Sequence, residues 1–220
     1  MSDVRLIVYS DFLCPWCWNA ATKLASVQSE LGPALTIEWK SYLLRPRPQP
    51  GRDLEKFRAY TQGWLRVAAD EPRAPFVPWA SDAGPPSHSV PPHAVAKAAA
   101  ELSPDAGARM RDRLFRAYFA ESRDISDRAT LAALWTEAGL EADAFESAGD
   151  PRFVRAVFAD HEEAQSLGAT GVPAVRLADQ DFVLVGAQPE AVYKRWLSRV
   201  ASAGPAGARS EPNASDGHRS

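Results

Sequence analysis

The distribution of apolar and polar residues predicts a strand, a helix and a second strand at the start of the chain. An apolar run at residues 4–10 predicts the first strand, and alternation at residues 35–42 predicts the second. Between them, a helix from Pro15 to Leu31 is ended by Gly32-Pro33, because proline cannot continue a helix. Two strands joined by a full helix are typical of a βαβ unit with parallel strands and a right-handed crossover.

Apolar residues in the middle of the chain recur every three to four positions, which is the spacing of amphipathic helices. Ser and Asp side chains mark where these helices begin, because they satisfy the free N–H groups of the first turn. The predicted helices are one from Asp53 to about Ala69, one at about 93–102, and three capped by Ser103, Ser126 and Asp150. We expect their apolar faces to form the core of a helical subdomain.

Seven prolines in residues 72–92 predict a long loop between the first two of these helices. The aromatic residues Phe76 and Trp79 offer apolar anchors, so we interpret the segment as a loop within the fold and not as a linker between domains. This loop is also a candidate lid over a site formed elsewhere in the chain.

The end of the chain returns to β-structure and then to a helix. Short apolar runs at 174–177 and 182–185 flank four mostly polar residues and predict a hairpin. Pro189 begins a last amphipathic helix. Residues 202–220 consist mainly of Gly, Ala, Pro, Ser and scattered charge, so we expect a disordered tail.

Composition excludes several classes of partner. The formal net charge is −3, with 45% hydrophobic and 24% charged residues, which is ordinary for a soluble globular protein and gives no sign of a nucleic-acid or membrane surface. No segment approaches the roughly 18 apolar residues of a membrane span. The first residues lack the basic and long apolar regions of a secretory signal, so we expect a cytoplasmic protein.

Candidate chemistry is concentrated in the only two cysteines, Cys14 and Cys17, at the start of the first predicted helix. Free amide N–H groups and the helix dipole stabilise a thiolate at this end, and the second thiol lies close enough to attack a mixed disulfide formed by the first. Pro15 fits the first turn, where a missing N–H group costs nothing. The spacing therefore favours a redox-active dithiol.

Two other interpretations of the cysteine pair are weaker. A zinc site usually needs a second pair of ligands, and the remaining candidates, His88, His93, His161 and His218, have no finger-like spacing. A structural disulfide in so small a ring adds little loop-closure stabilisation. We therefore expect no metal, and we interpret the histidines near the proline-rich loop as structural or solvated groups.

The order of these elements resembles the DsbA family, and within it the cytoplasmic FrnE-like branch. The segments that carry the resemblance are residues 9–17, 44–46, 114–119, 168–173 and 185–188. The resemblance implies an α/β thioredoxin fold with a large all-helical insertion. Its implied organisation is a thioredoxin-like domain of residues 1–50 and 169–201, an insertion at 51–168 with the proline-rich loop at 72–92, and the tail at 202–220.

The resemblance also implies an activity and a partner-binding backbone. In a thiol–disulfide oxidoreductase of this kind, Cys14 attacks a disulfide of a protein or low-molecular-weight thiol substrate, and Cys17 resolves the mixed disulfide. The bond before Pro173 is expected to be cis and to lie opposite the cysteines. The N–H and C=O groups of Val172 are then expected to be free to hold an extended partner segment.

Other residues around the motif are supporting candidates. Phe12, Trp16 and Trp18 could form an apolar rim that accepts a peptide or small thiol, with core packing as the alternative for each. Many thioredoxin-fold proteins carry a buried acid on the first strand, where this chain has Val8. Asp11 is the nearest carboxylate, and both proton transfer and ordering of the turn stay open as its role.

A second function class has to be weighed. The same fold resembles glutathione-dependent enzymes such as 2-hydroxychromene-2-carboxylate isomerase and kappa-class transferases, which usually have a group other than cysteine at one motif position. Two intact cysteines favour redox chemistry. We expect no bound cofactor, but glutathione is a candidate co-substrate, and Arg45 and Arg47 could pair with its carboxylates. A non-catalytic binding module is a third interpretation, and a homodimer is a candidate assembly.

Overall fold

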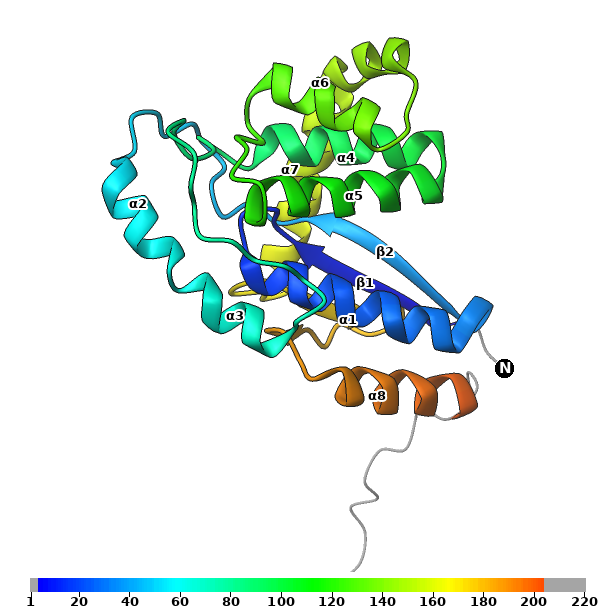
Figure 1. The fold of residues 1–220 in the computed structure, drawn as a ribbon. Coiled ribbons are helices and arrows are strands. Elements are labelled where there is room, and N and C mark those ends of the chain that lie inside the picture. Colours follow the sequence, from blue (N-terminus) through cyan, green and yellow to red (C-terminus); the bar gives the residue numbers. More distant parts are fainter. Residues whose placement is uncertain (1–3, 204–220) are drawn as a thin grey trace, which may run out of the picture.

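The computed structural model describes residues 4–203 and has a four-stranded mixed sheet at its centre (Figure 1). Its strands are β1 (Val4–Ser10), β2 (Leu35–Ser41), β3 (Ala174–Leu177) and β4 (Leu184–Val185), in the order β2-β1-β3-β4. β1 and β2 are parallel, with Val8 opposite Trp39, whereas β3 is antiparallel to both β1 and β4. The predicted βαβ unit and hairpin are therefore confirmed.

Helices cover both faces of the sheet and form the insertion between β2 and β3. They are α1 (Pro15–Leu31), α2 (Leu54–Thr61), α3 (Trp64–Asp70), α4 (Val90–Leu102), α5 (Pro104–Phe119), α6 (Arg128–Glu137), α7 (Pro151–Ser166) and α8 (Glu190–Ala203), with short 3-10 helices at Gly32–Ala34 and Ala142–Gly149. α4, α5 and α6 stack as a separate layer beside the sheet, and α8 runs alongside α1 (Figure 1). In the described part of the chain no helix is long and apolar enough to cross a membrane.

β1 is buried on both of its faces. Leu6 and Val8 pack on one side with Leu24 of α1 and with the apolar side of α8. Ile7 and Tyr9 pack on the other side with Ala164 of α7. Two-sided burial explains why residues 6–9 of this strand form a continuous apolar run and do not alternate.

The largest hydrophobic core lies in the insertion and extends to the cysteines. Apolar residues of α4, α5 and α6 form this cluster, in which Leu114, Phe115 and Trp135 are fully buried. The same cluster includes Cys14 and Cys17. The start of α1 is therefore held at the junction between the sheet and the helical insertion.

Helix starts follow the predicted caps with one exception. The side chains of Asp53, Ser103 and Asp150 accept hydrogen bonds from backbone N–H groups of α2, α5 and α7, as predicted. The predicted cap of α6 at Ser126 is wrong, because Asp127 accepts the bond from the Thr130 N–H group at 2.8 Å. The Ser126 hydroxyl instead donates to Asp124 at 2.6 Å.

The helix predicted from Asp53 to about Ala69 is interrupted at Gln62-Gly63, so that α2 and α3 are separate. The Thr61 hydroxyl donates to the Arg58 carbonyl at 2.8 Å and accepts from the Trp79 N–H group at 3.0 Å. A tertiary contact with the proline-rich segment therefore accompanies the break, at which Gly63, a poor helix former, is the N-cap of α3.

The proline-rich segment is ordered by its aromatic residues. Phe76 and Trp79 are buried in the insertion core, as predicted. α4 begins at Val90, earlier than the predicted start near residue 93, because Pro91 and Pro92 fit the first turn of a helix.

Two predictions at the C-terminal end need correction or fall outside the structure. The second hairpin strand is shorter than the predicted 182–185, because Phe182 is 70% exposed and only Leu184–Val185 pair with β3. The tail was predicted to begin at residue 202, but α8 continues to Ala203. Residues 204–220 lie outside the described part of the chain.

Close packing of α4 on α5 depends on Gly107. A methyl group at this position would lie 2.8 Å from the Cα atom of Ala100. We expect Gly107→Ala to lower the free energy of unfolding by about 1–3 kcal/mol, because overpacking outweighs the better helix propensity of alanine. Urea denaturation measures this change. Gly84→Ala is the control, since a Cβ atom there meets nothing within 4 Å; unchanged or increased stability of Gly107→Ala would contradict the proposed packing.

Candidate active site

The two thiols lie at the N-terminal end of α1, just beyond the end of β1 (Figure 1). Cys14 is the N-cap residue of α1, and the Cys17 N–H group donates to the Cys14 carbonyl at 3.0 Å. Both cysteines are free thiols. Cys14 retains 6% of its surface and Cys17 retains none, so the pair is asymmetric in its access to a substrate.

The chemical state of Cys17 is controlled by burial. Loss of solvent raises the pKa of the Cys17 thiol well above its ordinary value, and the neighbouring Cys14 thiol raises this pKa further. The N–H group of Asp11 donates to the Cys17 sulfur at 3.5 Å and acts in the opposite direction. The buried thiol therefore holds its proton at neutral pH and has to transfer it before it can act as a nucleophile.

Val172 and Pro173 lie against the cysteines although they are far away in the sequence. The Val172-Pro173 peptide bond is cis, as the resemblance implied. The Cys14 thiol donates to the Val172 carbonyl at 3.4 Å, and the Gly186 N–H group donates to the Pro173 carbonyl at 2.7 Å. The Val172 carbonyl was expected to be free for a partner, but in this structure it is occupied by the thiol of the site itself.

Asp11 is a completely buried carboxylate that organises the turn before α1. Its two oxygens accept hydrogen bonds from the Leu13 N–H group at 2.7 Å and from the Leu44 N–H group at 2.6 Å. Burial raises the pKa of Asp11 to about 6, although these hydrogen bonds act to lower it. The bonds tie the cysteine turn to the segment after β2; proton transfer by Asp11 stays a prediction.

The predicted apolar rim is wrong for two of its three aromatic residues. Trp16 is 41% exposed, but Phe12 and Trp18 are buried in the insertion core. The Phe12 ring lies 4.9 Å from that of Phe115, and the Trp18 ring lies 4.8 Å from that of Phe76. The insertion supplies these aromatic partners from positions about 60 to 100 residues later in the chain, so local sequence could not separate rim from core.

His93 and His161 have structural surroundings, and His218 lies outside the described residues. His93 is buried with its ring centre 4.8 Å from that of Phe12, and burial lowers the pKa of His93 to about 3. The His161 ring accepts from the Leu43 N–H group at 3.2 Å. Within residues 4–203 no three His, Cys, Asp or Glu side chains come together in a way that could hold a metal ion.

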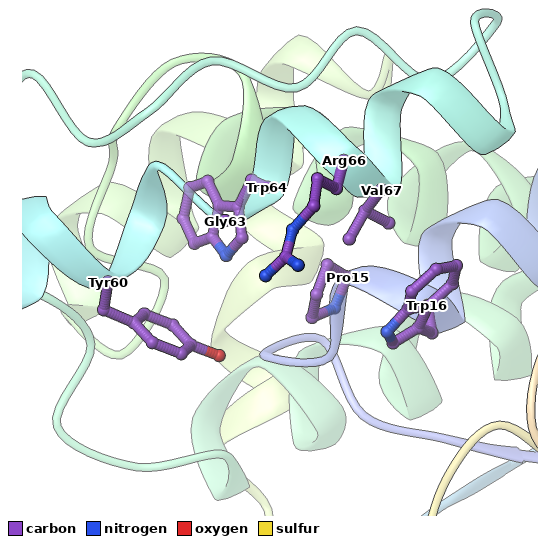
Figure 2. A pocket seen from close by; sticks show the side chains of 7 residues that line it. All are labelled: Pro15, Trp16, Tyr60, Gly63, Trp64, Arg66 and Val67. Atoms are coloured by element: carbon purple, nitrogen blue, oxygen red, sulfur yellow. The ribbon is translucent and has the colours of Figure 1, made fainter.

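A pocket of about 570 Å³ opens beside the cysteine motif (Figure 2). It is lined by Pro15, Trp16, Tyr60, Gly63, Trp64, Arg66 and Val67. Its far wall is therefore the α2–α3 segment, and neither the proline-rich loop nor Arg45 and Arg47 contributes to the lining. Tyr60, Trp64 and Arg66 were not predicted as site residues. Gly63 marks the helix break beside them, but a lone glycine does not show which side chains face the motif.

The sheet order, the dithiol at the start of α1 and the opposing cis-proline define a thioredoxin-like fold with a helical insertion. Residues 5–198 match the family model described as the DSBA-like thioredoxin domain, and the chain belongs to this family. The fold class and the family resemblance expected from the sequence are thereby confirmed.

Similar proteins span nearly the whole chain. YwbO of Bacillus subtilis (strain 168) is 28% identical over 207 residues, which cover 89% of this chain and 96% of YwbO. The cytosolic disulfide reductase DsbM from Pseudomonas aeruginosa, in its structure with GSH, has a TM-score of 0.70 and 28% identity, covering 88% of this chain and 99% of DsbM. The probable DsbA oxidoreductase SCO1869 from Streptomyces coelicolor has a TM-score of 0.72 and 27% identity, covering 97% and 94%.

The raised pKa of Asp11 predicts a specific dependence of stability on pH. The folded protein retains this proton up to about pH 6, whereas the unfolded chain releases it near pH 4, so the contribution of Asp11 to stability falls as pH rises through this interval. We expect wild type to lose about 2–3 kcal/mol relative to Asp11→Asn between pH 4 and pH 7. Urea denaturation across this range measures the difference.

Asp53→Asn provides the control for this experiment. Asp53 is an exposed cap whose pKa is lowered, chiefly by the hydrogen bond from the Lys56 N–H group, so its stabilising contribution is lost as pH falls. The Asp53 variant should therefore differ from wild type in the opposite sense. Parallel pH profiles for wild type and Asp11→Asn would show that Asp11 does not titrate in this window.

Proposed function

We propose that the protein is a thiol–disulfide oxidoreductase that uses Cys14 and Cys17 on protein or low-molecular-weight thiol substrates. The observation that carries this proposal is the asymmetry of the pair, in which Cys14 at the helix N-terminus keeps 6% of its surface and Cys17 is fully buried behind it. Membership of the DSBA-like family and similarity to DsbM, which is described as a cytosolic disulfide reductase, support it.

The proposed reaction begins at Cys14. Its thiolate, stabilised by the free N–H groups and dipole of α1, attacks one sulfur of a substrate disulfide, and the other substrate sulfur leaves as a thiolate that takes up a proton. Cys17 then attacks the Cys14 sulfur, which releases the second substrate thiol and leaves a Cys14–Cys17 disulfide. Two electrons pass from the protein dithiol to the substrate, and reversal of the steps oxidises a substrate dithiol.

We assign to Asp11 the proton released by Cys17. The Asp11 backbone contacts the Cys17 sulfur, and the carboxylate charge acts on the Cys17 thiol. Because the pKa of Asp11 is about 6, its carboxylate is ionised at neutral pH and can accept a proton. Burial of both groups keeps the transfer away from bulk water.

Several narrower statements belong to the same proposal. We place the protein in the FrnE-like branch of the family and in the cytoplasm. Similarity to DsbM, which is described as cytosolic, supports the proposed location. We propose glutathione as a co-substrate, since a relative of 28% identity has a structure with GSH. We also retain the division into a thioredoxin-like domain of residues 1–50 and 169–201 and an insertion at 51–168.

Single substitutions separate the roles of the two cysteines. Cys14→Ser should abolish disulfide exchange, because the attacking sulfur is lost, whereas Cys17→Ser should accumulate mixed disulfides that cannot be resolved. Thiol alkylation followed by mass spectrometry measures both outcomes. The chain has only two cysteines, so every trapped adduct in Cys17→Ser reports on Cys14. Equal and mild effects of the two changes would contradict the assigned roles.

A redox titration in glutathione buffers tests whether the pair is a working dithiol switch. We expect a reversible two-electron transition at a potential between about −270 mV and about −120 mV, the range of known dithiol oxidoreductases. The alkylation pattern measured at each glutathione ratio gives the potential. Thiols that bind glutathione but never form the internal disulfide would instead indicate a glutathione-dependent isomerase or transferase.

A further inference from the structure

The pocket beside the cysteine motif contains a buried hydrogen-bond donor with no partner. Trp64 is 2% exposed, and its indole N–H group has no acceptor. The Trp64 ring is fixed by edge-on packing against Phe119 at 4.8 Å and by Tyr118 at 5.3 Å. Because a buried donor without an acceptor is unfavourable, an incoming acceptor that meets this N–H group is favoured.

A positive charge faces the same space. The Arg66 side chain descends from α3, and its guanidinium lies between Trp64, Tyr60 and Pro15 (Figure 2). Neighbouring cations are paired, since Lys23 contacts Asp70 and Arg58 contacts Asp82, each at 2.6 Å. In residues 4–203 no acidic side chain pairs with Arg66, and none lines the pocket.

A third polar group completes the lining. Tyr60, near the end of α2, is 61% exposed, and its hydroxyl lies below the Arg66 guanidinium in the view of Figure 2. Its ring stacks on that of Phe57. Pro15, Trp16 and Val67 add apolar surface to the lining, and Pro15 and Trp16 directly follow Cys14 in the sequence. A molecule in this pocket therefore touches the redox motif itself.

The helix that carries Trp64 and Arg66 is held against α1. The Asn19 side chain of α1 donates to the Val67 carbonyl at 2.9 Å, and the buried Lys23 amine binds Asp70. These contacts hold α3 against α1, which carries the motif. The backbone of α3 and the buried Trp64 ring are therefore positioned by packing before any ligand arrives, which reduces the entropic cost of binding, while the Arg66 and Tyr60 side chains are exposed.

We propose that this pocket is a carboxylate subsite for the thiol or disulfide substrate. Arg66 would hold the carboxylate through parallel N–H bonds, while the Trp64 N–H and Tyr60 O–H groups donate to its oxygens. One cation with two neutral donors matches a monoanion better than a phosphate dianion. The cavity volume of about 570 Å³ suits a small peptide-like ligand. This inference rests on the proposed function, whose substrate class it narrows.

Two sources of such a carboxylate fit the pocket chemistry. One is a small acidic thiol such as glutathione, and the other is an acidic side chain close to a cysteine in a protein substrate. Both place an anion a short distance from the reacting sulfur.

A binding experiment tests the subsite without redox chemistry. S-methylglutathione carries the carboxylates but cannot exchange disulfides, and calorimetry measures its affinity. We expect Arg66→Gln to weaken binding about 10-fold, because a charge-assisted bidentate contact is lost, and Arg66→Lys to restore part of it. Arg155→Gln is the matched control, as an exposed arginine on α7 away from the pocket. Equal affinities of wild type and Arg66→Gln would overturn the proposal.

A kinetic experiment identifies the source of the carboxylate. Oxidised glutathione, neutral bis(2-hydroxyethyl) disulfide, and two peptide disulfides that differ only in Glu or Gln beside the cysteine each oxidise the reduced protein. We expect Arg66→Gln to slow the glutathione reaction about 10-fold and the neutral reaction less than twofold. Slowing of the Glu peptide alone would identify acidic protein segments as the source. Equal slowing of every reagent would overturn the subsite.

Trp64→Phe provides a second variant that removes the orphan N–H group. It should weaken S-methylglutathione binding while circular dichroism confirms the fold, and unchanged binding by a folded variant would exclude Trp64 from the subsite.

The proposed oxidoreductase function and the proposed carboxylate subsite can be contradicted independently of each other. If S-methylglutathione binding depends on Arg66 but the protein shows no disulfide exchange, the oxidoreductase function is contradicted and the subsite is supported. If disulfide exchange occurs at a rate that does not change in Arg66→Gln, the oxidoreductase function is supported and the subsite is contradicted.

Discussion

The packing of the cysteine turn against the aromatic core of the insertion is the constraint on which the site depends. Trp18 stacks on Phe119 at 5.9 Å and meets Phe76 edge-on, while Phe12 contacts Phe115. These rings anchor the turn before α1 and its first residues from both sides of the motif. The start of α1, where the helix dipole and free N–H groups act, is consequently fixed in position.

The same packing makes two chemically equal thiols different. It buries Cys17 completely and leaves Cys14 at the boundary, where its sulfur meets the Val172 carbonyl. Low solvation then keeps the Cys17 proton in place and raises the pKa of Asp11 toward neutrality. In the proposed mechanism, this hydrophobic packing sets the order in which the two sulfurs react.

Features that depend only on neighbouring residues were predictable from the sequence, whereas features that depend on competing or distant contacts were not. The cap at Asp53 follows from a single side chain and its nearby N–H groups, so the sequence shows it directly. Asp127 and Ser126 are both acceptable caps of α6, and the choice depended on a hydrogen bond between Ser126 and Asp124 that competes with capping. The separation of α2 from α3 involves Trp79, a contact that helical periodicity does not encode.

The sequence by itself determined the order of elements, the dithiol at a helix start and the family, because periodicity, caps and a short motif are local properties. Only the tertiary structure decided which aromatic residues are buried and which charged residue faces the motif. Phe12 and Trp18 became core because the insertion supplies their partners. Arg66 faces the motif because α3 packs on α1. Contacts between distant segments depend on how the chain folds back, and no local pattern records them.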